Sequence, residues 1–269
     1  MTTTALVPRR DYLAGQRRTI IARSVLAGAA GMVPVPFLDD WIVGTILGAG
    51  YRRIASAHGV DIDRDAEKSL VFGTAQPPSP LDIATGGVMY RVAGRAARRM
   101  LFALATIRRA RAASRNFVTM TLFDHYCAKL HRGLALDSAT ALALREDIGR
   151  AIDNTPGALA FHPFRRGALA AARALARAPL ELADLASFGA LRRMLAKKSE
   201  GSVDDAEHVD AVEQAMERAL ADKHGFLARS VASVELQLSS ELNPFLDAAL
   251  DSLDKRWRAR LAAEQDLDK

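Results

Sequence analysis

The stretch from residue 19 to residue 57, TIIARSVLAGAAGMVPVPFLDDWIVGTILGAGYRRIASA, decides the fold. Its apolar residues recur at helical spacing on both sides of a Pro-Val-Pro turn. Pro34 and Pro36 predict the end of one helix, because proline lacks an amide donor and clashes with the preceding turn. Asp39 and Asp40 predict the start of a second helix, where carboxylates meet free amides and the positive end of the dipole. The stretch therefore predicts a helical hairpin.

Small residues lie four apart on both arms of this hairpin. Ala27 and Gly31 are on the first arm, and Gly44 and Gly48 are on the second. Such spacing lets helix backbones approach closely, so we expect the arms to touch there. Trp41 follows the turn, and tryptophan favours the membrane interface. A hairpin inserted in a membrane and a tight helix pair inside a protein both fit the pattern.

The rest of the chain continues the helical pattern, with aromatic residues at only 6% and no pair of strands expected. The first arm should cover residues 11–33, and Gly59 should end the second near Ala57. Beyond the hairpin the expected helices are 65–72, 81–113, 138–152, 158–198 and one that begins at Pro244. We predict an all-α protein, a helical-hairpin-based bundle with a C-terminal helical extension.

Charge divides the chain unevenly, although the net charge is only +6. Residues 1–134 include 19 basic and 9 acidic residues, whereas residues 201–269 include 8 basic and 15 acidic residues. We predict an α-helical domain over 1–198 and an acidic C-terminal helical segment over 199–269, which packs on that domain or binds a partner. The two ends either attract each other in the fold or face different partners.

The location of the protein is predicted from what the sequence lacks. No signal peptide is recognised at the N-terminus, and the single cysteine, Cys127, excludes an internal disulfide. The uncharged stretch 24–38 is shorter than the roughly 20 apolar residues that a membrane-spanning helix needs. We expect a cytoplasmic protein that is peripherally associated with a membrane.

Part of the hairpin resembles a known family. The stretch GAAGMVPVPFLDD at 28–40, followed by an apolar helix and by IASAHGVD at 54–61, resembles the EcsC family. It also resembles a related family of helical domains found beside bacterial membrane-associated GTPases. The resemblance covers roughly residues 19–72 and implies a helical, often membrane-associated protein with no established catalytic residues to carry over. The chain has no GxxxxGK[ST] motif, so it is not itself such a GTPase.

The densest polar cluster is a candidate metal site. Asp124, Cys127 and His131 share one face of a helix, and all three residue types bind zinc. No second ligand motif such as HExxH accompanies them, and a buried cysteine with surface histidines is the commoner arrangement. We therefore predict no catalytic residue, no cofactor and no metal.

A stripe of arginines gives the sharper signal. At 100° per residue its five members fall within one quarter of a helix, with no acidic residue between them: Arg91, Arg95, Arg98, Arg99 and Arg109. A second set, Arg108, Arg111 and Arg115, falls on a different face, so we expect the helix to bend or end near Ala112. A basic amphipathic helix is typical of a surface that binds anionic lipid. It also suits nucleic-acid phosphates, or a face that is solvated or paired with the acidic segment.

The sequence thus predicts a non-enzymatic adaptor or scaffold that associates with membranes. It would dock on an anionic membrane surface, or on a membrane-associated protein, through the hairpin and the arginine stripe. The alternatives are a soluble nucleic-acid-binding helical protein and, more distantly, a metal-dependent enzyme.

Overall fold

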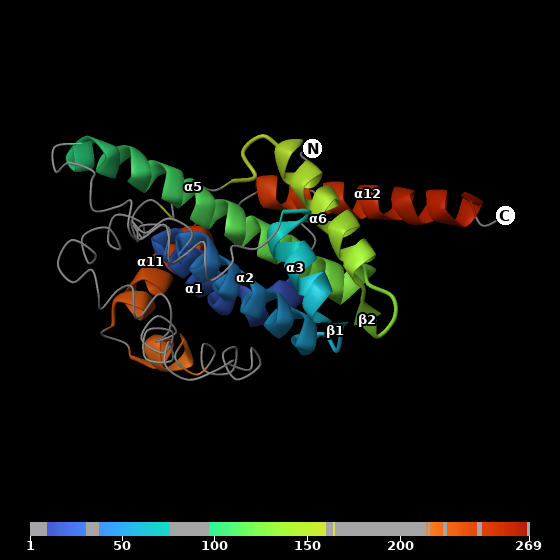
Figure 1. Cartoon of the computed structure of the whole chain (residues 1–269), viewed down its shortest axis with the longest axis horizontal. Coiled ribbons are helices and arrows are strands. Elements are labelled where there is room, and N and C mark those ends of the chain that lie inside the picture. The colour runs from blue at the N-terminus through green and yellow to red at the C-terminus, as the bar shows by residue number, and fades with distance from the viewer. Residues whose placement is uncertain are drawn as a thin grey trace, which may run out of the picture.

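Figure 1 shows the computed structural model of the chain. It describes residues 10–30, 38–75, 97–159, 164, 214, 216–222, 225–240 and 244–267. At the helical positions 29–30, 38–42, 97–107, 109, 226, 239–240 and 244 it describes the backbone. Apart from one short pair of strands, the regular structure in these residues is helical, which confirms the all-α prediction.

The predicted hairpin is formed by α1 (Ala14–Ala30) and α2 (Leu38–Ala57), which pack against each other. A short 3-10 turn, η1 (Asp11–Leu13), precedes α1. Gly59 follows α2 with a φ of 70°, a left-handed conformation that favours glycine, so the predicted end of α2 is confirmed. Gly31, Pro34 and Pro36 lie outside the described residues.

Gly44 and Gly48 of the second arm allow a close approach to a helix other than the first arm. They face α3 (Arg64–Phe72): a Cβ atom added at Gly44 would overlap the Phe72 ring, and one at Gly48 would overlap the Glu67 carboxylate. The spacing did not predict this contact, which forms because α3 folds back onto this side of α2. The small residues on α2 therefore admit a helix that follows it in sequence.

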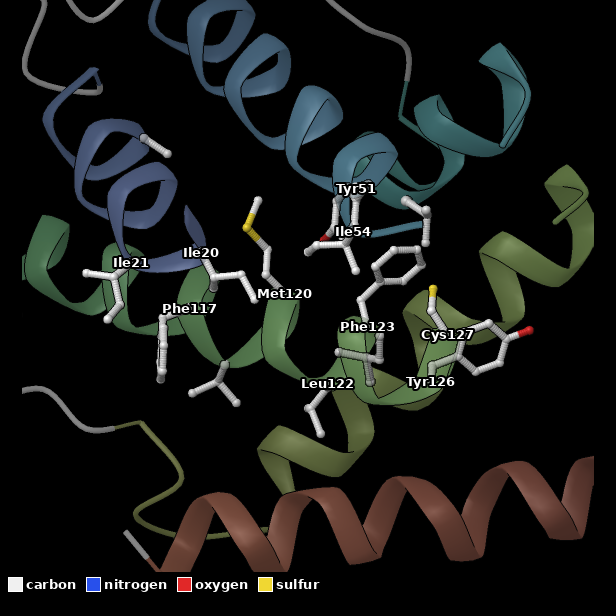
Figure 2. Packing of buried hydrophobic residues seen from close by; sticks show 14 of the residues in the cluster. Ile20, Ile21, Tyr51, Ile54, Phe117, Met120, Leu122, Phe123, Tyr126 and Cys127 are labelled. Carbon is white, nitrogen blue, oxygen red and sulfur yellow. The ribbon is translucent and has the colours of Figure 1, made fainter. Parts of the chain in front are cut away.

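The centre of the fold is α5 (Ala97–His125), which ends in a π-helical turn, η3 (Tyr126–Leu130). The helix continues past Ala112, so the alternative that it ends there was wrong. Ala110 is buried, the apolar side chains from Ala113 onward pack in the core, and residues 120–127 are all buried. In Figure 2, Ile20 and Ile21 of α1 and Tyr51 and Ile54 of α2 face this half of α5; the α5 and η3 side chains labelled there are Phe117, Met120, Leu122, Phe123, Tyr126 and Cys127.

One pair of strands departs from the sequence-based expectation. β1 (Asp61–Ile62) and β2 (Ala135–Leu136) pair in parallel, and the Asp61 amide donates to the Leu134 carbonyl at 2.7 Å. Two residues are too few to show the alternation of polar and apolar positions by which strands are recognised. The pair ties the end of the hairpin to the segment that follows α5.

The last helices close the bundle. α6 (Ser138–Asp153) follows Asp137, whose carboxylate accepts from the Thr140 amide at 2.8 Å and so caps the helix. α11 (Phe226–Ser240) packs on α1. α12 (Pro244–Leu267) begins at the predicted proline and packs along α6 and α5, and its final turns extend beyond the other helices (Figure 1). The described part of the acidic segment thus packs on the rest of the chain.

We expect Gly44→Ala to destabilise the protein. Its methyl group would meet the Phe72 ring, and overpacking costs about 1–3 kcal/mol, which outweighs a helix-propensity gain of up to about 1 kcal/mol. Gly149→Ala in α6 is the matched control, because nothing lies within 4 Å of its added Cβ atom, and it should stabilise the protein. Urea denaturation of both variants measures the difference, and an equal gain in stability in both would contradict the packing described.

Candidate functional site

The residues predicted to dock on a membrane are only partly described. Pro34, Pro36, Arg91 and Arg95 lie outside the described residues. The structure places the other predicted members on helices, by their backbone: Asp39, Asp40 and Trp41 in the first turn of α2, and Arg98, Arg99 and Arg109 in α5.

The described arginines of α5 form a basic surface. Arg108, Arg111 and Arg115 are exposed and share one side of the helix, with spacings of three and four residues. Arg115 pairs with Asp153 at 3.3 Å. Arg108 and Arg111 make no ion pair with any residue that the structure describes. We call these three arginines the basic face; sequence reasoning had separated them from the predicted stripe.

The acidic residues of α12 find their basic partner at the other end of the chain. The Arg10 guanidinium lies 3.3 Å from the Asp247 carboxylate and 2.7 Å from that of Asp251. Among the described side chains, the basic residue that pairs with these two acids therefore comes from the N-terminal segment and not from the basic face. Part of the charge asymmetry in the sequence is balanced within the fold.

Three polar side chains are linked by hydrogen bonds and connect the N-terminal segment and the last helix to α5. The Tyr12 hydroxyl lies 2.5 Å from Nδ1 of His125, and Nε2 of His125 lies 2.6 Å from the Asp254 carboxylate. Because ionised aspartate only accepts, Nε2 carries the hydrogen and Nδ1 accepts from Tyr12 when the ring is neutral. Burial raises the pKa of Tyr12, which keeps its hydroxyl protonated, and burial lowers the pKa of His125, which favours the neutral ring. We call this arrangement the Tyr12–His125–Asp254 chain.

A second buried polar pair fixes α2 to α5. Nε2 of His58 lies 2.6 Å from Oδ1 of Asp124, and the Asp124 side chain is fully buried. Its other oxygen has no hydrogen-bond partner among the described residues. Burial raises the pKa of the Asp124 carboxyl, and the hydrogen bond with His58 opposes this effect. The pair is a structural contact at the end of the hairpin.

The weak candidate for a metal site does not assemble. Among the described residues, no group of three or more His, Cys, Asp or Glu side chains is placed to hold a metal ion. The π-helical turn adds a residue to the turn before His131, which moves this side chain off the face it would share with Asp124 and Cys127 on a regular helix. His131 instead lies 3.1 Å from the Tyr126 hydroxyl through Nδ1.

A cavity of about 320 Å³ lies beside this turn, between η3, α6 and α12. Tyr126 and Trp257, which pack edge to face at 4.9 Å, line it together with charges of both signs on Arg132, Arg260 and Glu264. Arg260 already pairs with Asp147 at 2.7 Å. The mixed lining favours no single charge class of ligand.

No family model, curated protein or solved structure matches the chain. In the part of the chain that the structure covers, no helix combines the length and the apolar character needed to cross a membrane.

The Tyr12–His125–Asp254 chain predicts a pH dependence of stability. Because burial lowers the pKa of His125 below its ordinary 6.5, the unfolded chain takes up this proton at a higher pH than the folded protein does. The free energy of unfolding should therefore fall between about pH 7 and about pH 5. His125→Gln keeps one donor and one acceptor but cannot titrate, so chemical denaturation should show a shallower pH dependence in this variant. Identical pH profiles for the wild type and the His125→Gln variant would contradict the conclusion that His125 causes this pH dependence.

Cys127 should be inert in the folded protein. The thiol is buried, and burial raises its pKa well above the ordinary value, so little thiolate forms. Labelling with dithionitrobenzoate should be slow in buffer and complete in denaturant, with a clean signal because the chain has a single cysteine. Rapid labelling of the native protein would show that the thiol is accessible.

Proposed function

We propose that the protein is a non-enzymatic adaptor or scaffold that docks on an anionic membrane surface or on a membrane-associated protein. The observation that carries the proposal is the basic face. These arginines lie on α5, and the second half of α5 is buried in the core. The fold therefore holds the basic face in a fixed position. Each basic residue near an anionic surface contributes about 1 kcal/mol to binding.

The hairpin offers less apolar surface for membrane contact than the sequence alone had suggested. In the second half of α2, Ile46, Tyr51 and Ile54 are buried in the protein core. Membrane contact through the hairpin therefore rests on the prediction for Trp41, because tryptophan favours the membrane interface. The resemblance of residues 19–72 to the EcsC family agrees with a peripheral, membrane-associated role on the cytoplasmic side.

The chemistry of the buried polar groups favours an adaptor over an enzyme. Asp124 and His125 are hydrogen-bonded to side chains from other elements, and the Cys127 thiol is buried. Each of these groups therefore serves the fold in the arrangement described.

Vesicle binding tests the proposal. Arg108→Gln with Arg111→Gln removes two charges from the basic face with little change in helix propensity. Affinity for vesicles of phosphatidylglycerol in phosphatidylcholine should fall by about 2 kcal/mol, roughly thirtyfold. The matched control is Arg64→Gln with Arg132→Gln, an equal loss of exposed charge near β1 and β2, at the other end of the molecule from the start of α5 (Figure 1).

Two results would contradict the proposal. An equal loss in the control variant would indicate a nonspecific effect of net charge. Duplex DNA binding that is lost in the Arg108→Gln, Arg111→Gln variant, without vesicle binding by the wild type, would favour the nucleic-acid alternative.

A further inference from the structure

An open groove runs between the turn that follows α6 and the first half of α12. It encloses about 800 Å³. Its lining includes Asn154, Thr155 and Pro156 on one side and Phe245, Lys255 and Arg256 on the other. We call this feature the α12 groove.

The cations of the α12 groove are not neutralised by the described residues around it. Asp251 also lines the groove, but its carboxylate is held by Arg10 at 2.7 Å. Lys255 is exposed and makes no ion pair with a described residue. The Nε atom of Arg256 is buried and lacks a hydrogen-bond partner within the described structure. The groove therefore presents an ammonium and a guanidinium with capacity for an anion.

An aromatic side chain stands at the edge of the same groove. Phe245 is 49% exposed, although most large apolar side chains described here are buried. Its ring lies close to Gly157, where an added Cβ atom would come within 3.1 Å of it. Phenylalanine beside basic residues is typical of surfaces that lie in the membrane interface.

The α12 groove is continuous with the basic face. Arg115 of that face lies 3.3 Å from Asp153, and Asp153 immediately precedes Asn154 of the groove wall. Cations from α5 and α12 therefore flank the same turn.

We propose that the α12 groove holds the phosphate headgroup of an anionic phospholipid, while Phe245 enters the boundary between headgroups and acyl chains. This inference rests on the proposed membrane docking and assigns it a lipid site. Arg256 provides the planar guanidinium that binds phosphate oxygens in pairs, and Lys255 adds a point charge. The occupant is a lipid of the bilayer, because a free phosphate would leave Phe245 in water.

The test uses the full-length chain and vesicles with and without phosphatidylglycerol. Lys255→Gln with Arg256→Gln should weaken binding to the anionic vesicles roughly thirtyfold. Phe245→Ala should weaken it roughly tenfold through lost apolar burial. Leu236→Ala is the matched control for Phe245, since Leu236 is an exposed apolar residue on α11, and it should bind like the wild type. Circular dichroism checks that each variant folds.

The outcomes separate the two proposals. If the wild type binds anionic vesicles and Arg108→Gln with Arg111→Gln weakens binding, while the Lys255, Arg256 and Phe245 variants bind normally, the groove is not the lipid site and membrane docking stands. If the wild type does not bind anionic vesicles, both proposals fail. A calorimetric titration with inorganic phosphate tests whether the groove binds a free anion instead of a lipid. If phosphate alone saturates the groove and vesicles do not compete with it, the occupant is a free anion and the lipid assignment is overturned.

Discussion

Residues 120–127 of the central helix are buried on every side, and the rest of the structure depends on this constraint. A helix in that position cannot direct its polar side chains to water, so Asp124 and His125 need partners from elsewhere in the chain. His58 supplies one, and Tyr12 and Asp254 supply the others. These partners come from the hairpin, the N-terminal turn and the last helix. Burial of one helical segment thus fixes where three other parts of the chain must lie.

The same arrangement distributes the charges. Because Tyr12 and Asp254 meet at His125, Arg10 is brought to the acidic side of α12 and pairs with Asp247 and Asp251. Charges that stand at opposite ends of the sequence compensate each other there. The basic face on α5 and the cations of the α12 groove then remain toward solvent, on either side of the turn after α6. This remaining positive charge is the physical basis of the proposed docking on an anionic surface.

The hairpin has a different role from the one its small residues suggested. Gly44 and Gly48 accommodate α3, and Gly50, where an added Cβ atom would lie 2.5 Å from Met120, accommodates α5. The second arm is therefore enclosed by neighbouring helices over most of its length. Because Ile46, Tyr51 and Ile54 of this arm are buried, the cations of α5 and α12 make up the larger part of the proposed surface.

The sequence by itself determined the features that depend on a few neighbouring residues. Gly59 ends α2, Asp137 caps α6 and Pro244 begins α12, because each acts on backbone groups within about one helical turn. Leu250, Leu253 and Trp257 recur at helical spacing and form the buried side of α12, because helical periodicity shows which side of a helix is buried. Periodicity does not show which element covers that side, so α3 against α2 was missed.

Only the tertiary structure decided the contacts between residues far apart in the chain. Tyr12 and His125 are separated by 113 residues, and His125 and Asp254 by 129, so no local pattern links them. The α12 groove was missed for the same reason: its cations lie in an acidic segment, and they remain uncompensated only because Arg10 occupies the neighbouring acids. The sequence showed where the arginines of α5 lie along the chain. Long-range packing buries the second half of this helix, and this burial decided that the helix continues past Ala112 and which of its sides faces solvent.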